Sequence, residues 1–543
     1  MLGQMMKMPL AIPSLIRHAD RWHGDTEIVS RLPTGEVHRY DWRTAHVRAR
    51  KLARALAMRA VESGERIGTL AMNGHRHLEI YYGVSGLGAV CHTINPRLFL
   101  DQIAWIVNDA QDRYVFFDPA FMTLVESLVA RCPRVRGWVA MTERENMPAS
   151  SVPLLCYEDL IAAADTRFEW PEIDEDSASS LCYTSGTTGD PKGALYSHRS
   201  TLLHSFAVCL PDAFGLSASE VVLPVVPMFH VNAWGIPYAA AMTGTKLVLP
   251  GAKLDGASLF ELFESEGVTI TAGVPTVWLA LLRHMEENGL TPSTLKRVLI
   301  GGAAAPAAMI RAFRERHGID VIHAWGMTEL SPLGTVNRFK AKHAGSTEET
   351  RESLREKQGR PPFGIDLRIV GAAGRQIAHD GAEFGDLQAR GHWVIDRYFR
   401  DAGGEVLDGG WFPTGDVATL DADGYMKITD RSKDVIKSGG EWISSIAIEG
   451  LAMSHPAIAQ AAVIGVPHPK WDERPLLVAV PKEGAKVTRE ELLGFLAGKI
   501  AKWWIPDDVI FVEALPHTAT GKVSKLELRR QLAAYRLRTD CGA

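Results

Sequence analysis

Residues 183–198 read YTSGTTGDPKGALYSH and contain three glycines among several hydroxyl side chains. Such a composition disfavours a regular helix or strand, because glycine loses most backbone freedom on folding and Ser and Thr compete for backbone hydrogen bonds. A loop of this kind can turn its backbone N–H groups inward and form a nest for phosphate groups, and Lys192 adds a mobile positive charge. The segment therefore predicts a phosphate-binding loop, with a polar surface turn as the plain alternative.

The spacing around Lys192 excludes one well-known phosphate loop. In the Walker A pattern GxxxxGK[ST], a glycine precedes the lysine and a hydroxyl residue follows it. Here Lys192 follows Asp190-Pro191 and precedes Gly193. The loop is predicted to bind phosphate by another arrangement.

Bulk composition narrows the class of protein. The chain has 543 residues, 46% of them apolar and 23% charged, with a formal net charge of −5. This balance is typical of a globular protein with several structural units, and it contains no basic block that would indicate nucleic-acid binding. Six scattered cysteines without metal-ligand spacing favour free thiols in the cytoplasm. Pro9 and Pro13 interrupt the apolar N-terminus, which indicates neither a signal peptide nor a membrane span.

Strand-like and helix-like segments alternate along most of the chain. Apolar residues at helical spacing predict a helix over 42–56, a strand is expected over 65–72, and a helical pattern runs through 79–90. This alternation predicts α/β architecture with mainly parallel sheets. Further short β-type runs lie at residues 113–118, 246–250, 268–274 and 295–302.

The pattern of expected strands and helices changes near residue 430. Downstream, strands are expected over 461–466 and 475–481, followed by a helix that Thr488 and Glu491 open in a capping-box arrangement. This part is predicted to be a small α+β module of normal domain size. The expected division is a large N-terminal unit of several subdomains, a hinge and a mobile C-terminal lid, over residues 1–429, 430–433 and 434–543 respectively.

Six segments together resemble the signature motifs of the adenylate-forming enzymes, the superfamily of acyl-CoA synthetases, peptide-synthetase adenylation domains and firefly-type luciferases. They occur in the family's order and span essentially the whole chain. The segments are TSGTTGDPKG (184–193), PMFHVNAW (227–234), AWGMTE (324–329), WFPTGD (411–416), DRSKDVIKSGGEW (430–442) and PHTATGKVSK (516–525).

The resemblance implies a reaction in two steps. A carboxylic acid and ATP, with Mg²⁺, give an acyl-adenylate and pyrophosphate. The lid then turns, and the thiol of coenzyme A displaces AMP to form a thioester. The expected partners are therefore small molecules, with no nucleic acid and no integral membrane contact, and the expected assembly is a homodimer.

The same resemblance assigns the nucleotide site. Thr184 and Glu329 are expected to bind Mg²⁺, since hard cations bridge carboxylate and phosphate oxygens. Asp416 matches the residue that accepts hydrogen bonds from both ribose hydroxyls, and Arg431 matches a second ribose contact. Without the motifs, Glu329 would be read as a solvated surface acid and Asp416 as an Asx-turn residue. The other expected nucleotide-binding residues are Ser185, Gly186, Thr187, Thr188, Gly189, Lys192, Gly302, Ala303, Ala324, Trp325, Gly326, Met327 and Thr328.

Four residues are expected to act in catalysis: Lys522, His230, Thr328 and Lys437. Lys522 lies in the lid motif, and a lysine delivered by a closing lid can neutralise the charge that gathers on the transferring phosphate. His230 matches an aromatic position beside the substrate carboxylate, with a packed core histidine as its alternative. A lysine in a C-terminal loop would otherwise be solvent-exposed.

The lid motif near residue 437 implies the coenzyme A site. In the family this loop swings toward the active site after pyrophosphate leaves and lines the channel for the pantetheine arm. Lys433 matches the hinge residue whose backbone rotation turns the lid. The residues expected to line the channel are Lys437, Gly439, Gly440, Glu441 and Trp442.

Several segments resemble the branch of medium- and long-chain fatty acyl-CoA synthetases, which includes ligases for 3-(methylthio)propionate. The expected substrate is 3-(methylthio)propionate or another short- or medium-chain acid, with a long-chain acid as the alternative. A luciferase-like oxygenase and a non-catalytic nucleotide-binding scaffold are two further hypotheses, because one fold hosts several chemistries. The expected acid pocket comprises His230, Val231, Trp234, Val274, Gly302 and Ala303.

Overall fold

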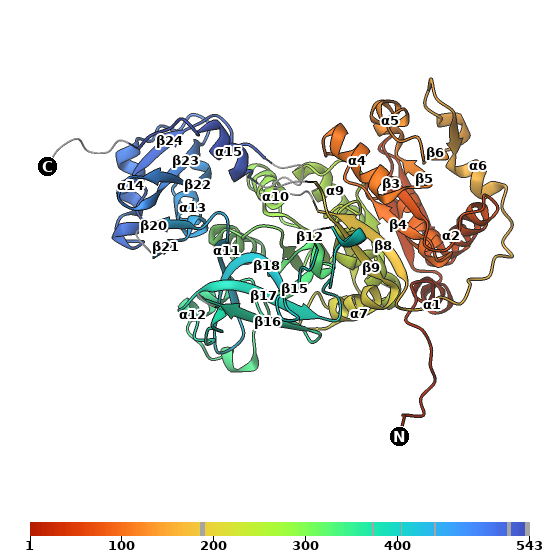
Figure 1. The fold of residues 1–543 in the computed structure, drawn as a ribbon, viewed down its shortest axis with the longest axis horizontal. Helices are drawn as coiled ribbons and strands as arrows, with labels where there is room; N and C mark the ends of the chain where they lie inside the picture. The colour runs from red at the N-terminus through yellow and green to blue at the C-terminus, as the bar shows by residue number, and fades with distance from the viewer. Residues whose placement is uncertain (185–189, 372–373, 403, 439–440, 518–522, 538–543) are drawn as a thin grey trace.

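Two large sheets and two smaller ones organise the chain (Figure 1). The computed structural model describes residues 1–184, 190–371, 374–402, 404–438, 441–517 and 523–537. Over these residues it has the predicted α/β class, with a large N-terminal part and a smaller C-terminal part.

The first large sheet has seven strands, all parallel except the edge strand β9. In spatial order they are β7 (Leu154–Cys156), β6 (Gly137–Ala140), β5 (Tyr114–Phe117), β3 (Arg66–Leu70), β4 (Val90–Thr93), β8 (Ala178–Tyr183) and β9 (Gly193–Ser197).

The second large sheet has eight strands, and its central strands are parallel while both edge strands are antiparallel. In spatial order they are β15 (Leu333–Val336), β14 (Asp320–Gly326), β13 (Arg297–Ile300), β12 (Ile270–Gly273), β10 (Val221–Pro224), β11 (Lys246–Leu249), β1 (Glu27–Arg31) and β2 (Val37–Asp41).

Helices cover these sheets in layers. One core joins the facing sides of the two sheets with α1 (Pro13–His23), α2 (Trp42–Ala57), α3 (His75–Gly86), α7 (His198–Cys209) and α8 (Ile236–Thr243). A second core packs α9 (Gly256–Glu266), α10 (Pro275–Asn288) and α11 (Ala307–His317) on the other side of the eight-stranded sheet. A third packs α4 (Leu100–Ala110) and α5 (Met122–Val129) on the other side of the seven-stranded sheet. Two shorter helices are α6 (Tyr157–Ala162) and α12 (Glu348–Arg355).

The predicted helix over 42–56 is confirmed as α2, and its start is fixed by chemistry visible in the sequence. Asp41 is its N-cap and accepts a 2.8 Å hydrogen bond from the backbone N–H of Thr44, which satisfies one of the free donors of the first turn. The apolar residues at helical spacing, among them Trp42 and Leu56, are buried. The helical pattern expected through 79–90 is partly wrong: α3 ends at Gly86, Gly88 has φ 87°, and Val90 starts β4.

Two smaller sheets follow along the chain. The four-stranded antiparallel sheet was not expected from the sequence; its strands are β16 (Ile365–Val370), β17 (Gly385–Gly391), β18 (Phe412–Leu420) and β19 (Met426–Arg431). The C-terminal sheet has the order β21 (Glu441–Ile443), β20 (Ile436–Ser438), β23 (Asp472–Pro481) and β22 (Ile458–His468), with β24 (Asp508–Phe511) paired to β23.

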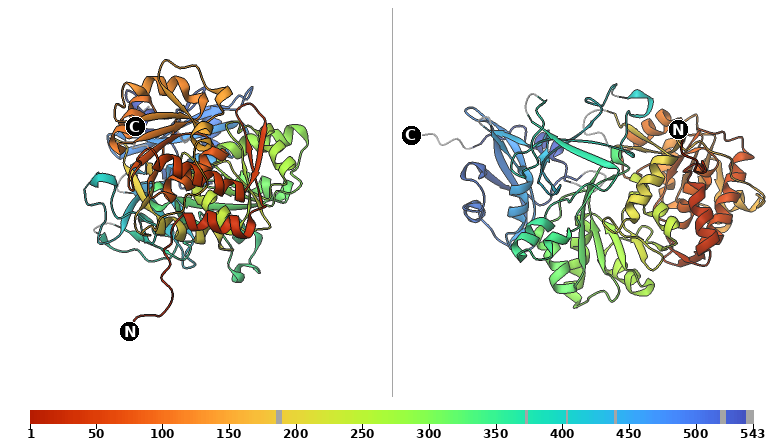
Figure 2. Two further views of the ribbon diagram at one scale, coloured as in Figure 1. Left: turned by 90° about the vertical axis from the view of Figure 1, so that its right-hand side faces the viewer. Right: turned by 90° about the horizontal axis from the view of Figure 1, so that it is seen from below.

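The C-terminal part has its own cores and lies at one end of the molecule, away from α1 to α6 (Figure 2). Its helices are α13 (Ser445–Met453), α14 (Arg489–Leu496) and α15 (Lys525–Gln531). The predicted capping box is confirmed: Glu491 N donates to Thr488 Oγ1 over 3.2 Å, and Thr488 N donates to the Glu491 carboxylate over 2.8 Å. No helix among the described residues is long and apolar enough to cross a bilayer.

Candidate active site

The carboxyl ends of strands from both large sheets meet at one place, where ligands of open α/β sheets commonly bind. Strands β8 and β9 form an antiparallel pair around residues 184–192, and Thr184 N donates to Lys192 O over 2.8 Å. From β9, Tyr196 OH donates to the backbone oxygen of Thr328 over 2.6 Å. Thr328 opens the short 3₁₀ helix η4 (Thr328–Leu330) after β14. Two predicted motifs far apart in the sequence are therefore joined directly.

A chain of contacts leads from the phosphate loop to Glu329. The ammonium group of Lys192 lies 5.1 Å from the ring centroid of Tyr398, and Tyr398 OH donates to Glu329 Oε1 over 2.7 Å. The next segment, η7 (Phe399–Asp401), packs on β9 so closely that a β-carbon at Gly193 would lie 3.0 Å from Cβ of Phe399. A side chain at Gly193 would therefore require its neighbours to shift.

Glu329 is a buried acid whose side chain faces a specific hydroxyl. The residue is 6% exposed, and burial raises its carboxyl pKa, while the hydrogen bond from Tyr398 acts in the opposite direction. A carboxylate kept in a low-dielectric site beside a phosphate loop suits a hard cation. Among the described residues, no group of three or more His, Cys, Asp or Glu side chains could hold a metal ion by itself. A cation here would therefore take many of its ligands from phosphate and water.

The raised pKa of Glu329 predicts a pH effect. The group takes up its proton at a higher pH than an ordinary glutamic acid, whose pKa is 4.5, so a function that needs the carboxylate should fail earlier as pH falls. Tyr398→Phe removes a bond that favours the ionised form and should move the acid limb of pyrophosphate release to higher pH. The measurement is kcat/KM for ATP against pH, with Glu329→Gln as the control that lacks the group. An acid limb at the same pH in wild type and Tyr398→Phe would contradict this expectation.

Asp416 is buried between two other predicted site residues. It is 2% exposed; Trp325 Nε1 donates to Oδ2 over 2.8 Å, and Arg431 Nε lies 2.8 Å from Oδ1. Asp416 and Arg431 are also direct partners across β18 and β19. Trp325 and Arg431 therefore hold the orientation of this buried carboxylate.

Further residues expected to bind the nucleotide lie after β13 and on or directly after β14. Gly302 has φ 78°, a conformation that glycine adopts without strain, and Ala303 is exposed. Ala305 N donates over 3.3 Å to Nε2 of the buried His323, which ties this loop to β14. Of the β14 segment, Ala324 is buried whereas Gly326 and Met327 are half-buried.

The predicted acid-pocket residues fall into two neighbouring groups. His230 and Val231 line a pocket at the ends of β4 and β8, together with Thr93, Asn95 and Tyr183. Trp234 instead packs over the loop after β13: a β-carbon built on Gly301 would lie 2.9 Å from Cη2 of its indole. Trp234 is thereby next to the predicted Gly302 and Ala303. Val274 caps α10 and is half-buried.

The predicted hinge and lid residues that the structure describes lie on or beside β19, β20 and β21. Asp430 and Arg431 belong to β19, and Lys433 follows this strand. Partial desolvation of its amine, together with the nearby arginines, lowers the pKa of Lys433. Lys437 is exposed on β20, and its backbone N–H donates to Glu473 over 3.1 Å. Glu441 and Trp442 lie on β21. Ser185 to Gly189, Gly439, Gly440 and Lys522 lie outside the described residues.

A buried ionic cluster joins the C-terminal helix α15 to β19. Lys525 Nζ lies 2.7 Å from Glu449 Oε1 and donates to Ser445 Oγ. Ser445 N donates over 2.6 Å to the buried Asp430. One helical turn after Lys525, Arg529 pairs with Asp434 at 2.7 Å. Two cations of α15 therefore face acids at the start of the C-terminal part.

Three residues of the site were missed by the sequence argument. Tyr196 and Lys525 lie inside quoted segments, whereas Tyr398 lies outside all of them, and each acts through a partner at least 69 residues away. A tyrosine directly after the phosphate loop was a usable signal, since buried tyrosine hydroxyls generally need a partner.

Comparison with known proteins shows the family to which the chain belongs. The model of the AMP-binding enzyme family matches residues 15–399, and that of the AMP-binding enzyme C-terminal domain matches 447–522. The chain is 57% identical to the 3-methylmercaptopropionyl-CoA ligase of Ruegeria lacuscaerulensis, over 97% of this chain and 98% of that protein. It is 52% identical to the medium-chain-fatty-acid–CoA ligase of Ectopseudomonas oleovorans, over 99% of each.

A solved structure shows the same architecture. The anthranilate CoA ligase AuaEII in complex with anthranoyl-AMP superposes with a TM-score of 0.86 at 26% identity, covering 98% of this chain and all of that chain. The family resemblance carried by the motifs and the α/β fold predicted from the alternation of strands and helices are thus both confirmed. The chain belongs to the AMP-binding enzyme family of adenylate-forming enzymes.

Proposed function

We propose that this protein is an AMP-forming acid–CoA ligase that acts on 3-(methylthio)propionate or another short- or medium-chain fatty acid. The observation that carries the proposal is the set of contacts that brings the predicted motifs together. Lys192 lies over the ring of Tyr398, which donates to Glu329, and Tyr196 donates to the backbone oxygen of Thr328. Trp325, from the same motif as Glu329, donates to Asp416. The relatives that are 57% and 52% identical over nearly the whole chain are named 3-methylmercaptopropionyl-CoA ligase and medium-chain-fatty-acid–CoA ligase. These names support the proposed acid substrate and coenzyme A as the thiol.

In the first step, a carboxylate oxygen of the acid attacks the α-phosphorus of ATP and pyrophosphate leaves. The loop over 184–192 holds the phosphates through backbone N–H groups, with Lys192 supplying positive charge. Asp416, oriented by Trp325 and Arg431, accepts hydrogen bonds from the ribose. Lys522 neutralises charge on the transferring phosphate when the lid closes.

Thr184 and Glu329 would hold Mg²⁺, which when bound neutralises charge on the phosphate oxygens. The residues present fit this ion, because a hydroxyl and a buried carboxylate are hard oxygen donors. Thr184 is fixed by its backbone bond to Lys192, and Glu329 is fixed by Tyr398.

In the second step, the thiol sulfur of coenzyme A attacks the acyl carbonyl carbon and AMP leaves. We place the hinge at residues 430–433, between units 1–429 and 434–543, and infer that rotation near Lys433 brings Lys437 and residues 439–442 to the acyl-adenylate. The separate family-model matches over 15–399 and 447–522 support this division. His230 lines the pocket at the ends of β4 and β8. There it would contact the acid in the first step and move away from the acyl group before the thiol attacks.

Trp234 is proposed to limit the length of the acid. Its indole covers Gly301 beside the predicted pocket, so Trp234→Ala should open space for a longer chain. Since each methylene is worth about 1–3 kcal/mol in such sites, the ratio of kcat/KM for octanoate to that for 3-(methylthio)propionate should rise about tenfold or more. Steady-state rates with both acids and with palmitate measure this ratio. An unchanged ratio would show that Trp234 does not determine which chain length the enzyme prefers.

One assay separates the proposed function from its rivals. Wild-type protein is incubated with ATP, Mg²⁺, coenzyme A and 3-(methylthio)propionate, butyrate, octanoate or palmitate under nitrogen, and AMP, pyrophosphate and thioester are quantified. Equal amounts of the three products without oxygen are expected, with the first three acids used best. Dependence of product formation on oxygen would favour a luciferase-like oxygenase. No pyrophosphate with any acid would favour a nucleotide-binding scaffold, and a preference for palmitate would favour the long-chain alternative.

A cytoplasmic homodimer completes the proposal. The cytoplasmic location is supported by the free cysteines: the five that the structure describes are not paired with one another. Light scattering of the purified protein measures the assembly; a monomeric mass would contradict the dimer.

A further inference from the structure

We propose that Asn232 is a positioning residue that locks the acid-binding turn to the strand leading into the phosphate loop. The proposal rests on the proposed function and deepens it, because it makes the placement of the acid depend on the nucleotide side of the site. Asn232 lies between His230 and Trp234 in the motif HVNAWG and acts through its neighbours.

The turn around Asn232 has an unusual backbone. Four consecutive non-glycine residues have positive φ: Val231 at 48°, Asn232 at 50°, Ala233 at 50° and Trp234 at 57°. Left-handed conformations bring Cβ close to the backbone carbonyl oxygen, so L-residues adopt them singly and rarely in succession. Such strain persists only where the surroundings determine it. The turn therefore needs specific contacts to keep its shape.

The side chain of Asn232 supplies those contacts. It is 4% exposed; its Nδ2 donates to Ser180 Oγ over 3.0 Å, and Cys182 Sγ donates to its Oδ1 over 3.6 Å. Ser180 and Cys182 are two residues apart on β8 and so face the same side of the strand. Cys182 in turn lies 3.2 Å from Thr93 Oγ1 on β4. The carboxamide is the polar link in an otherwise apolar region.

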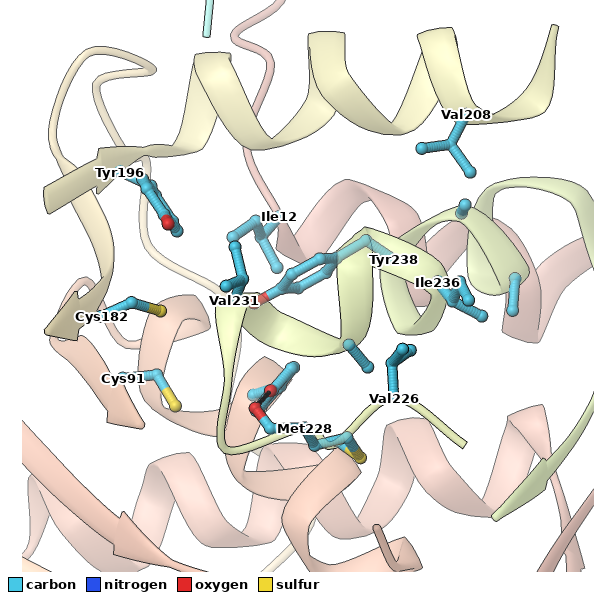
Figure 3. Close-up of a cluster of buried hydrophobic side chains, with 14 of the residues drawn as sticks. Ile12, Cys91, Cys182, Tyr196, Val208, Val226, Met228, Val231, Ile236 and Tyr238 are labelled. Carbon is cyan, nitrogen blue, oxygen red and sulfur yellow. Dashed lines mark hydrogen bonds between the residues drawn. The ribbon is translucent and has the colours of Figure 1, made fainter. Parts of the chain in front are cut away.

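The surroundings of this link are closely packed. Figure 3 shows Cys182 of β8 and Val231 of the turn in the same buried cluster, with the ring of Tyr238 from α8 beside Val231. Neither Val231 nor Ala233 carries a side-chain hydrogen-bonding group, so Asn232 alone among these buried turn residues can make a polar side-chain tie to β8.

The two ends of the link reach both halves of the proposed site. Cys182 is followed by Tyr183 and then by Thr184, the residue proposed to bind the metal. At the other end, the turn fixes His230 on the pocket and Trp234 over Gly301. A displacement of the end of β8 would thus be transmitted to the groups that contact the acid. Asn232 thereby couples the position of the acid-binding turn to the position of the strand that leads into the phosphate loop.

A double-mutant cycle tests the link. Asn232→Gly accepts the positive φ but removes the carboxamide, and Ser180→Ala removes its partner while leaving the turn intact. Each single variant should raise KM for the acid and lower kcat/KM of pyrophosphate release about tenfold, and the double variant should lose little more. Ala233→Gly is the matched control: it relaxes the same turn without touching the link, and its kcat/KM should stay within about twofold of wild type.

The cycle also separates positioning from plain stability. Thermal unfolding is recorded for all variants, and rates are compared where each is folded. Additive losses in the double variant, or a KM for the acid equal to that of wild type in Asn232→Gly, would overturn the positioning role. Wild-type protein that releases no pyrophosphate with any acid would instead overturn the proposed function, and the inference with it.

Discussion

Replacement of Lys522 by alanine is expected to slow formation of the acyl-adenylate by about 10²–10³ and to spare thioester formation from supplied acyl-adenylate. The first step gathers negative charge on the transferring phosphate, and a preorganised cation stabilises it most where water is excluded. The second step displaces AMP and, in the proposed cycle, takes place with the lid turned away. The two half-reactions should therefore respond very differently to one substitution.

The residues on either side of the segment that contains Lys522 are joined by backbone contacts. Residues 518–522 lie outside the described residues, but both flanks are fixed: His517 and Val523 form an antiparallel bridge, and Ser524 N donates to Pro516 O over 2.7 Å. Lys525 then anchors the following helix. The position of the loop base is thus defined by the fold.

The measurement is isotope exchange between pyrophosphate and ATP for the first step, and thioester formation from synthetic acyl-adenylate and coenzyme A for the second. Lys486→Ala, at an exposed lysine of the same C-terminal part, is the control and should change neither rate by more than about twofold. Equal losses in both half-reactions of Lys522→Ala would show that the lysine does not act in the first step alone.

Replacement of Lys525 by methionine is expected to lower the free energy of unfolding by about 3–5 kcal/mol. The side chain of Lys525 is 13% exposed, and that of its partner Glu449 is 14% exposed. Burial alone would lower the pKa of Lys525, but Glu449 and Asp430 outweigh it and raise that pKa. Methionine keeps the length of the side chain and leaves both acids without their cation.

Denaturant unfolding followed by far-UV circular dichroism measures this loss, and Lys486→Met serves as the exposed control. Removing the acid as well, in Lys525→Met with Glu449→Met, should recover part of the stability, because a buried pair replaced by apolar groups often costs little. A single variant Lys525→Met that unfolds at the wild-type midpoint would show that the buried cluster contributes nothing to stability.

Local signals in the sequence predicted much of the fold. The cap at Asp41, the capping box at Thr488 and the alternation of short apolar strands with helices all depend on neighbours within a few residues. The four-stranded antiparallel sheet was missed although its strands pair in sequence order, because glycine-containing connections separate the strands and obscure the strand pattern. The family motifs identified the segments of the site, and their mutual arrangement came only from the structure.

The contacts that assemble the site could not be read from one sequence. Tyr398 and Glu329 are 69 residues apart, and Tyr196 and Thr328 are 132 residues apart, so no local pattern relates them. The left-handed turn over 231–234 contradicts local preference, since only Asn232 of its four residues tolerates positive φ readily. Tertiary packing determines that turn.

The central claim is that the loop between β8 and β9 binds the triphosphate of ATP while Asp416 binds the ribose. A crystal structure with a non-hydrolysable ATP analogue and Mg²⁺ tests it most directly. The expected result is a triphosphate within hydrogen-bonding distance of Thr184 to Lys192 and ribose hydroxyls on Asp416. A triphosphate bound elsewhere, with that loop making no contact to it, would contradict the assignment of the nucleotide site.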